Sequence, residues 1–203
     1  MHITHAPKFN IHRARLLPLL TVTLLLAACG GHEVPKPVAY IRIDMPDHSY
    51  TTVDTAALPF TFEKSDEATI TWKRDNSREK WIDLNYPAYR GVVFLSYKTI
   101  AGEHDLKAQI DTAYKFLSMH FDHTSGIDEK QYIDTASHVY ANTSHLLGPN
   151  VASTYQFWVT DSVHHFLGGA LYIDRTPNND SLAPVLEYLQ EDINHLIESI
   201  RWR

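Results

Sequence analysis

The sequence predicts an α+β fold, in which an antiparallel β-sheet packs with two main helices. Three observations support this prediction. Short runs that alternate apolar and polar residues, typical of half-buried strands, recur between residues 40 and 173. Two segments, 103–120 and 182–202, carry apolar residues at helical spacing. Several links between the predicted strands have hairpin length, which favours antiparallel neighbours.

The first element in chain order is a short apolar run that ends at residue 28. Three basic residues and no acidic residue precede it. A basic start, an apolar run and small residues at its end indicate a secretory signal peptide over residues 1–28, and the run is too short to span a membrane. Leu26-Ala27-Ala28-Cys29 resembles the lipobox of bacterial lipoproteins, in which the cysteine is lipidated. An ordinary signal peptide cut near Ala28 is the alternative.

Composition then limits the class of protein. Without residues 1–28 the chain has 175 residues with 15 basic and 24 acidic side chains, a formal charge of −9. This balance argues against nucleic acid as a partner, and against a polybasic contact with lipid. Cys29 is the only cysteine, so no internal disulfide can form. We expect a tether over residues 29–39, a single domain over residues 40–203, and membrane attachment through the lipid.

Strand character fills most of the first half of this domain. Gly91–Tyr97 is a nearly continuous apolar run, as expected for a strand covered on both faces. Pro87–Arg90 is short enough to connect it to the preceding strand as a hairpin. The predicted strands here are Tyr40–Asp44, a short one near Phe60–Phe62, Thr69–Lys73, Trp81–Tyr86 and Gly91–Tyr97.

The pattern then becomes helical. Five apolar residues recur at spacings of four, three, four and four, which predicts a helix from Glu103 to about His120. They are Leu106, Ile110, Ala113, Leu117 and Phe121. Three strands are predicted next: Gln131–Tyr140, Ala152–Thr160 and His165–Ile173. Gly168-Gly169 in the last of them indicates a bulge or a closely approaching neighbour.

The last helix is predicted from Leu182 to about Trp202, after a polar loop over residues 174–181. Ser181 is its expected N-cap, and Pro184 falls in its first turn, where a missing N–H costs little. From Gly91 onward the order of elements resembles the PsbP/Mog1-like fold, whose members are mostly binding or assembly factors. That resemblance concerns the fold and implies no function by itself.

Histidines are the first candidates for chemistry. His120 and His123 have a spacing that suits a metal pair, but zinc requires three or four ligands. Further ligands are available on the predicted strands, at His138, His145, His164 and His165. No spacing signature links these residues, so we interpret them as ordinary surface and strand histidines. A metal-dependent enzyme built on them remains the alternative.

Two other motifs have simpler structural interpretations. Ser162 with Asp161 and a following histidine has the residue types of a nucleophile site. Adjacent residues of one turn do not easily form the required hydrogen-bonded series, so a hairpin turn is favoured. The loop from Asp174 resembles a calcium loop, but its twelfth position is Val185, where a carboxylate is required.

Aromatic residues are the third group, with four tryptophans and 11 tyrosines. Such side chains are common at protein interfaces, although most of them are expected to fill the core. We select four residues of the predicted 152–173 strand pair as candidate partner-binding residues. They are Trp158, Tyr155, His164 and His165.

Six segments carry a resemblance to a known family: residues 35–40 (PKPVAY), 82–87 (IDLNYP), 155–162 (YQFWVTDS), 165–172 (HFLGGALY), 177–184 (PNNDSLAP) and 198–203 (ESIRWR). They resemble the gliding motility lipoprotein GldD family. The resemblance is weakest before Leu16 and over residues 47–68. It implies a cell-envelope lipoprotein needed for gliding, a machinery coupled to the type IX secretion system. It supplies no catalytic residue or cofactor, so we expect a non-enzymatic, periplasm-facing accessory or assembly factor that binds envelope proteins. A periplasmic small-ligand-binding module is a further alternative.

Overall fold

The structure is a computed structural model that describes residues 45–203, except residue 77 and residues 175–178. Over these residues it contains α-helices and antiparallel strands, which confirms the predicted α+β class. The strands are β1 (Tyr50–Val53), β2 (Phe60–Ser65), β3 (Thr69–Asp75), β4 (Glu79–Tyr86), β5 (Gly91–Thr99), β6 (Gly126–Asp134), β7 (Val139–Leu147), β8 (Tyr155–Thr160), β9 (His165–Ile173) and β10 (Arg201–Trp202). The helices are α2 (Glu103–Ser118) and α3 (Asn179–Ser199).

Four predictions fall on segments that the structure does not describe. The signal peptide over residues 1–28, the lipidation site Cys29, the tether over residues 29–39 and the strand over residues 40–44 lie outside the described residues. In the described part of the chain, neither helix combines the length and the apolar character needed to cross a membrane.

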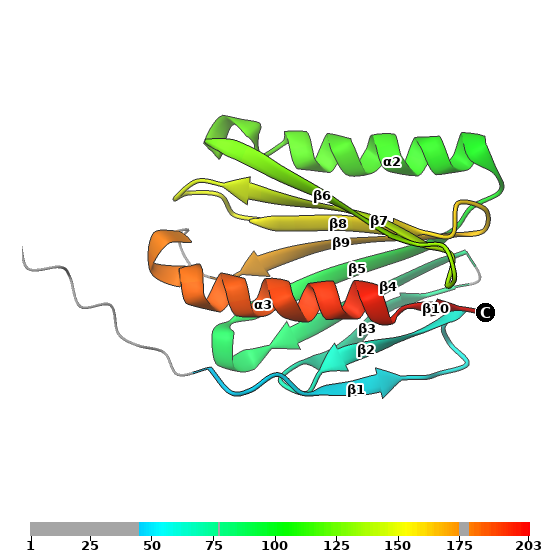
Figure 1. The fold of residues 1–203 in the computed structure, drawn as a ribbon, viewed down its shortest axis with the longest axis horizontal. Helices are drawn as coiled ribbons and strands as arrows, with labels where there is room; N and C mark the ends of the chain where they lie inside the picture. Colours follow the sequence, from blue (N-terminus) through cyan, green and yellow to red (C-terminus); the bar gives the residue numbers. More distant parts are fainter. Residues whose placement is uncertain (1–44, 77, 175–178) are drawn as a thin grey trace, which may run out of the picture. The chain divides into compact units, whose positions relative to one another are not determined.

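The strands form two sheets (Figure 1). The larger has seven strands in the order β3-β4-β5-β9-β8-β7-β6, and the smaller has the order β1-β2-β10. Every pairing is antiparallel. The strand β5 lies inside the larger sheet between β4 and β9, which explains its long apolar run.

The larger sheet has two different faces. On β5, alternate residues such as Val93 and Leu95 are buried in a core that also contains residues of α3 and β2. We call this the inner face. The residues between them, such as Phe94 and Ser96, point to the outer face, where α2 lies (Figure 1). Burial of each large aliphatic side chain in the core contributes about 2 kcal/mol.

Helix α2 covers the outer face loosely. Glu103 and Asp105 lie in its first turn and Lys115 in its last, which matches the helix dipole. Leu117 is the only fully buried residue of the helix. The helix ends at Ser118, two residues before the predicted end, and Phe121 lies in the following 3₁₀ turn with 47% of its surface exposed.

The predicted strand Gln131–Tyr140 is wrong. The chain forms the hairpin β6–β7 instead, with its turn in the middle of that segment. The Asp134 carboxylate accepts hydrogen bonds from the N–H groups of Ala136 and Ser137, and His138 adopts a positive φ of 54°. A short polar side chain that bonds the backbone two residues on favours a turn over a continuous strand.

The chain end also differs from the prediction. Helix α3 begins before Ser181 and ends at Ser199, after which β10 pairs with β2. The pairings of β9 run without a register shift through Gly168 and Gly169, so no bulge is present. The other interpretation, a closely approaching neighbour, is correct because Phe157 lies against Gly169. The PsbP/Mog1-like topology stays a prediction.

Candidate functional site

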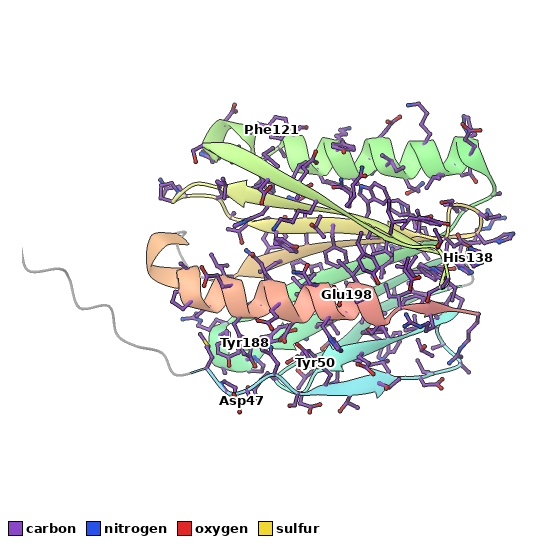
Figure 2. All side chains as sticks on the ribbon, viewed as in Figure 1. Asp47, Tyr50, Phe121, His138, Tyr188 and Glu198 are labelled. Atoms are coloured by element: carbon purple, nitrogen blue, oxygen red, sulfur yellow. The ribbon has the colours of Figure 1, made fainter. Side chains whose placement is uncertain are left out.

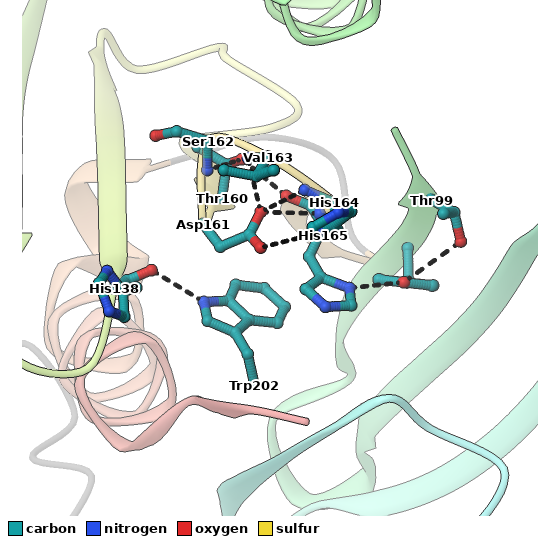
Figure 3. Close-up of polar contacts among 10 residues, drawn as sticks. Thr99, His138, Thr160, Asp161, Ser162, Val163, His164, His165 and Trp202 are labelled. Atoms are coloured by element: carbon teal, nitrogen blue, oxygen red, sulfur yellow. Dashed lines mark hydrogen bonds and ion pairs between the residues drawn. The ribbon is translucent and has the colours of Figure 1, made fainter. Parts of the chain in front are cut away.

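The turn between β8 and β9 is organised by Asp161 (Figure 3). One oxygen of the Asp161 carboxylate accepts hydrogen bonds from the backbone N–H groups of Val163, His164 and His165. The nitrogen–oxygen distances are 2.9, 2.8 and 2.8 Å. Ser162 adopts a φ of 71° and donates its backbone N–H to Thr160 Oγ1. In this described turn the Ser162 hydroxyl makes no hydrogen bond to a histidine. The geometry is that of a hairpin turn, as the sequence predicts.

The electrostatics of Asp161 agree with a structural role. Burial alone would raise the pKa of this carboxyl, but the three backbone N–H donors outweigh burial and lower it. A lowered pKa means that the ionised form stabilises the folded state above the pKa of the unfolded chain. That contribution is lost as pH falls through the folded-state pKa.

Replacement of Asp161 by alanine is expected to lower the free energy of unfolding by about 2 kcal/mol at pH 7, because three N–H donors lose an ionised acceptor. Chemical denaturation at several pH values measures this loss. The difference between wild type and D161A should shrink as the pH falls below about 4. D161N, which keeps the acceptor oxygen, is the control and should lose less. An equal loss in both variants, or a difference that stays constant with pH, would contradict the assignment.

His165 joins this turn to the C-terminal strand. Its Nδ1 lies 2.8 Å from the hydroxyl of Tyr97, and its ring stacks on Trp202 with centroids 5.0 Å apart. The Trp202 indole N–H donates to the backbone carbonyl of His138 (Figure 3). Burial lowers the pKa of His165, which favours the neutral ring. These contacts fix the end of the chain against the larger sheet.

A second polar cluster connects α3 to the segment around β1, where Figure 2 labels Tyr50 and Tyr188. Asp192 is 2% exposed, and its Oδ1 lies 2.7 Å from His48 Nδ1. The His48 ring stacks on Tyr188 at 4.1 Å. One turn beyond Asp192 on α3, the His195 ring stacks on Tyr50 with centroids 3.6 Å apart. Burial, followed by the charge of Asp192, raises the pKa of Tyr188 to about 12. The cluster anchors the segment around β1 to α3.

Metal ligation has no support among the described residues, because none of their histidines and carboxylates form a group of three or more that suits a metal ion. His120 and His123 flank the turn after α2, and His138 lies in the β6–β7 turn. His145 lies on β7 beside Tyr155. The histidines that the alternative metal site would need are therefore spread over different parts of the fold.

A hollow lies between α2 and the outer face of the larger sheet, and we call it the α2 cavity. Its volume is about 490 Å³, within the range of sites that hold small organic ligands. Aromatic side chains from strands and helix form much of its wall: Phe94, Phe116, Trp158, Phe166 and Tyr172. The ring of Trp158 stacks on Phe166 with centroids 6.2 Å apart.

The floor of the cavity follows from two rows of paired residues. In one row Phe94 pairs with Ala170, which pairs with Gln156. In the next row Ser96 pairs with Gly168, which pairs with Trp158. The centre of each row is a small residue of β9, so the floor is hollow there. Larger side chains border it at Phe94 of β5 and at Gln156 and Trp158 of β8.

The four candidate partner-binding residues do not share one surface. Trp158 lines the α2 cavity on the outer face. Tyr155 belongs to the inner face, is 5% exposed, and donates its hydroxyl to Asn194 Oδ1 of α3 at 2.7 Å. His164 is exposed at the tip of the β8–β9 turn, whereas His165 is half-buried under Trp202.

The α2 cavity was not predicted from the sequence, because its wall comes from segments distant in the chain. One signal was present. Phe116 is a large apolar residue outside the apolar stripe of the predicted helix, and it is exposed beside the cavity. This apolar residue outside the predicted core face therefore marked the region.

Comparison with known protein families identifies the family to which this chain belongs. A family model described as "Gliding motility lipoprotein GldD" matches residues 30–202. No curated protein and no solved structure gave a match. The matched range includes every described strand and helix, the β8–β9 turn and the walls of the α2 cavity. The chain therefore belongs to the gliding motility lipoprotein GldD family.

Proposed function

We propose that the protein is a lipid-anchored, periplasm-facing accessory or assembly factor of the gliding motility machinery and its linked type IX secretion system. It acts by binding other envelope proteins and performs no catalysis. The observation that carries this proposal is the family match over residues 30–202. Two of the polar groups that the sequence offers for chemistry support it, since Asp161 and His165 are engaged in structural contacts.

An exposed apolar surface lies at the C-terminal end of α2. Four large hydrophobic side chains lie there within eight residues, each at least 42% exposed. They are Tyr114, Phe116, Met119 and Phe121, which we call the α2 patch. Figure 2 labels Phe121 at the end of the helix. Clustered exposed hydrophobic residues mark interaction sites, and aromatic residues and methionine are enriched at protein interfaces. We assign the envelope partner to this patch.

Attachment to the membrane gives a prediction of its own. Substitution of Cys29 by serine removes the thiol that would carry lipid, so the chain should move from the detergent-rich to the aqueous phase after phase separation. The control introduces serine at the neighbouring position, and Ala28→Ser should leave most of the protein in the detergent phase. Equal partitioning of C29S and wild type would contradict a lipid anchor at this residue.

The partner is tested by photo-crosslinking in the native envelope. A crosslinking residue placed at Phe116 should recover a component of the motility or secretion machinery, identified by mass spectrometry. The matched control places the same residue at exposed Thr52 of β1, on the smaller sheet. Recovery of no such component from position 116, or equal recovery from position 52, would overturn the assignment.

A further inference from the structure

We propose that two copies of this chain pair through the exposed edge of strand β6, in antiparallel orientation about a two-fold axis at Lys130. The pairing joins the larger sheets of the two copies into one continuous sheet. This edge shares no residue with the α2 patch, so its failure would leave the assignment of the envelope partner standing. Three features support the proposal: a long and regular edge, charges that complement themselves about the axis, and an exposed isoleucine with an apolar counterpart.

Strand β6 is a long and regular edge of the larger sheet. Its nine residues pair with β7 on one side without a register shift, and no described strand pairs with the other side. An edge strand presents backbone N–H and C=O groups that can pair with another chain. The opposite edge, β3, has an irregular register between Trp72 and Arg74, which hinders such pairing. The outer strands of the smaller sheet, β1 and β10, have only four and two residues.

The sequence of β6 sets the register of the pair. Strand β6 reads GIDEKQYID, with Lys130 at its centre. With Lys130 on the axis, all nine residues pair with the second copy, Glu129 lies opposite Gln131, and no two acidic residues are directly opposed. A pair centred on Glu129 would place this residue opposite itself, and a pair centred on Gln131 would place Asp128 opposite Asp134. Like charges directly opposite each other are unfavourable, so the register centred on Lys130 is favoured over both neighbours.

The charges at the axis complement one another. Lys130 Nζ lies 3.8 Å from Asp128 Oδ2 of the same strand, and the two side chains are 77% and 55% exposed. On the axis the two copies of Lys130 lie opposite each other, which would be unfavourable if they were alone. Each lysine, however, has its own Asp128 beside it and the Asp128 of the second copy on the diagonal. The four charges therefore sum to zero.

Ile133 provides an apolar contact on the outer face. It is 65% exposed on β6, where an isoleucine gains nothing from water. In the proposed pair it lies opposite Ile127 of the second copy. Ile127 itself packs against Leu117 and Leu146 at the end of α2. The two-fold axis produces this isoleucine pair twice, once on each side of Lys130.

The test is sedimentation equilibrium of the full chain carrying Cys29→Ser, which has no acyl group to drive micelle formation. The mass should rise with concentration and approach twice that of one chain. Lys130→Glu gathers four acidic side chains at the axis and should raise the dissociation constant at least about tenfold. Asp128→Lys combined with Lys130→Glu restores two charges of each sign and should restore the dimer. Lys107→Glu is the control, since this similarly exposed lysine pairs with Asp111 on α2, and it should leave the dimer unchanged.

A single cysteine tests the register, because Cys29→Ser leaves the chain without cysteine. On the axis, Lys130→Cys lies opposite its own copy with Cα atoms about 5 Å apart, which suits a disulfide. Mild oxidation should therefore crosslink this variant into dimers, whereas Thr52→Cys on the smaller sheet should stay uncrosslinked. The mass of one chain at every concentration, no recovery of the dimer in a folded double variant, or equal crosslinking from both positions would each overturn the proposal.

Discussion

Substitution of Gly169 by alanine is expected to lower the free energy of unfolding by about 3 kcal/mol, because it overpacks a filled core. The added Cβ would lie within 3.0 Å of three ring carbons of Phe157, which pairs with Gly169 across β8 and β9. Phe157 is 4% exposed and belongs to the main core, so its ring has no room to move aside. Urea denaturation of wild type and variant measures the effect.

The adjacent glycine is a matched control. Gly168→Ala places a methyl group on the opposite face of the same strand, with its nearest neighbour at 3.8 Å. It should change stability by less than about 1 kcal/mol, and the change should be favourable, because alanine reduces the entropy of the unfolded chain. Phe157→Leu combined with Gly169→Ala should lose less than the sum of the single variants. Similar losses for the two glycine substitutions would contradict the close approach of Phe157.

Removal of the Trp202 side chain is the second large effect, and Trp202→Ala is expected to cost about 3 kcal/mol. The indole stacks on His165, packs edge-on against Phe60 with centroids 5.4 Å apart, and donates to the His138 carbonyl. These contacts connect β10 to the smaller sheet and to the β8–β9 turn. Thermal or urea denaturation would show the loss.

Trp202→Phe separates the two kinds of contact. It keeps a ring against His165 and loses the hydrogen bond to His138, so it should cost about 1 kcal/mol beyond its smaller area. If the alanine variant lost no more stability than the phenylalanine variant, the stack would contribute nothing, and β10 would not hold the chain end.

The sequence predicts those elements whose pattern is local. The apolar run of β5 and the long apolar stripe of α3 are found where they were expected, because burial imposes their periodicity directly. The β6–β7 hairpin was missed because β6 is polar and largely exposed, and because the turn depends on the Asp134 carboxylate accepting hydrogen bonds from the backbone just after it. The two-residue strand β10 was missed because its only reason to leave the helix is pairing with distant β2.

For the candidate sites, too, the sequence predicts only what is determined by local residues. Asp161-Ser162 is a turn in both the prediction and the structure, since one side chain and its own neighbours determine it. Of the four predicted partner-binding residues, Tyr155 and Trp158 lie on opposite faces of one strand, as strict alternation requires. The α2 cavity combines β5, β8, β9 and α2, and no local pattern reports how far a helix stands from a sheet.

The central claim is that this protein serves gliding by binding a partner through the α2 patch. Its most direct test is the spreading of colonies in which the chromosomal gene carries Met119→Glu and Phe121→Glu, two exposed substitutions that leave the core intact. With protein level and membrane fractionation equal to wild type, these cells should spread no further than cells lacking the gene, whereas a Thr52→Glu strain should spread normally. Normal gliding by cells that carry the doubly substituted protein would contradict the account.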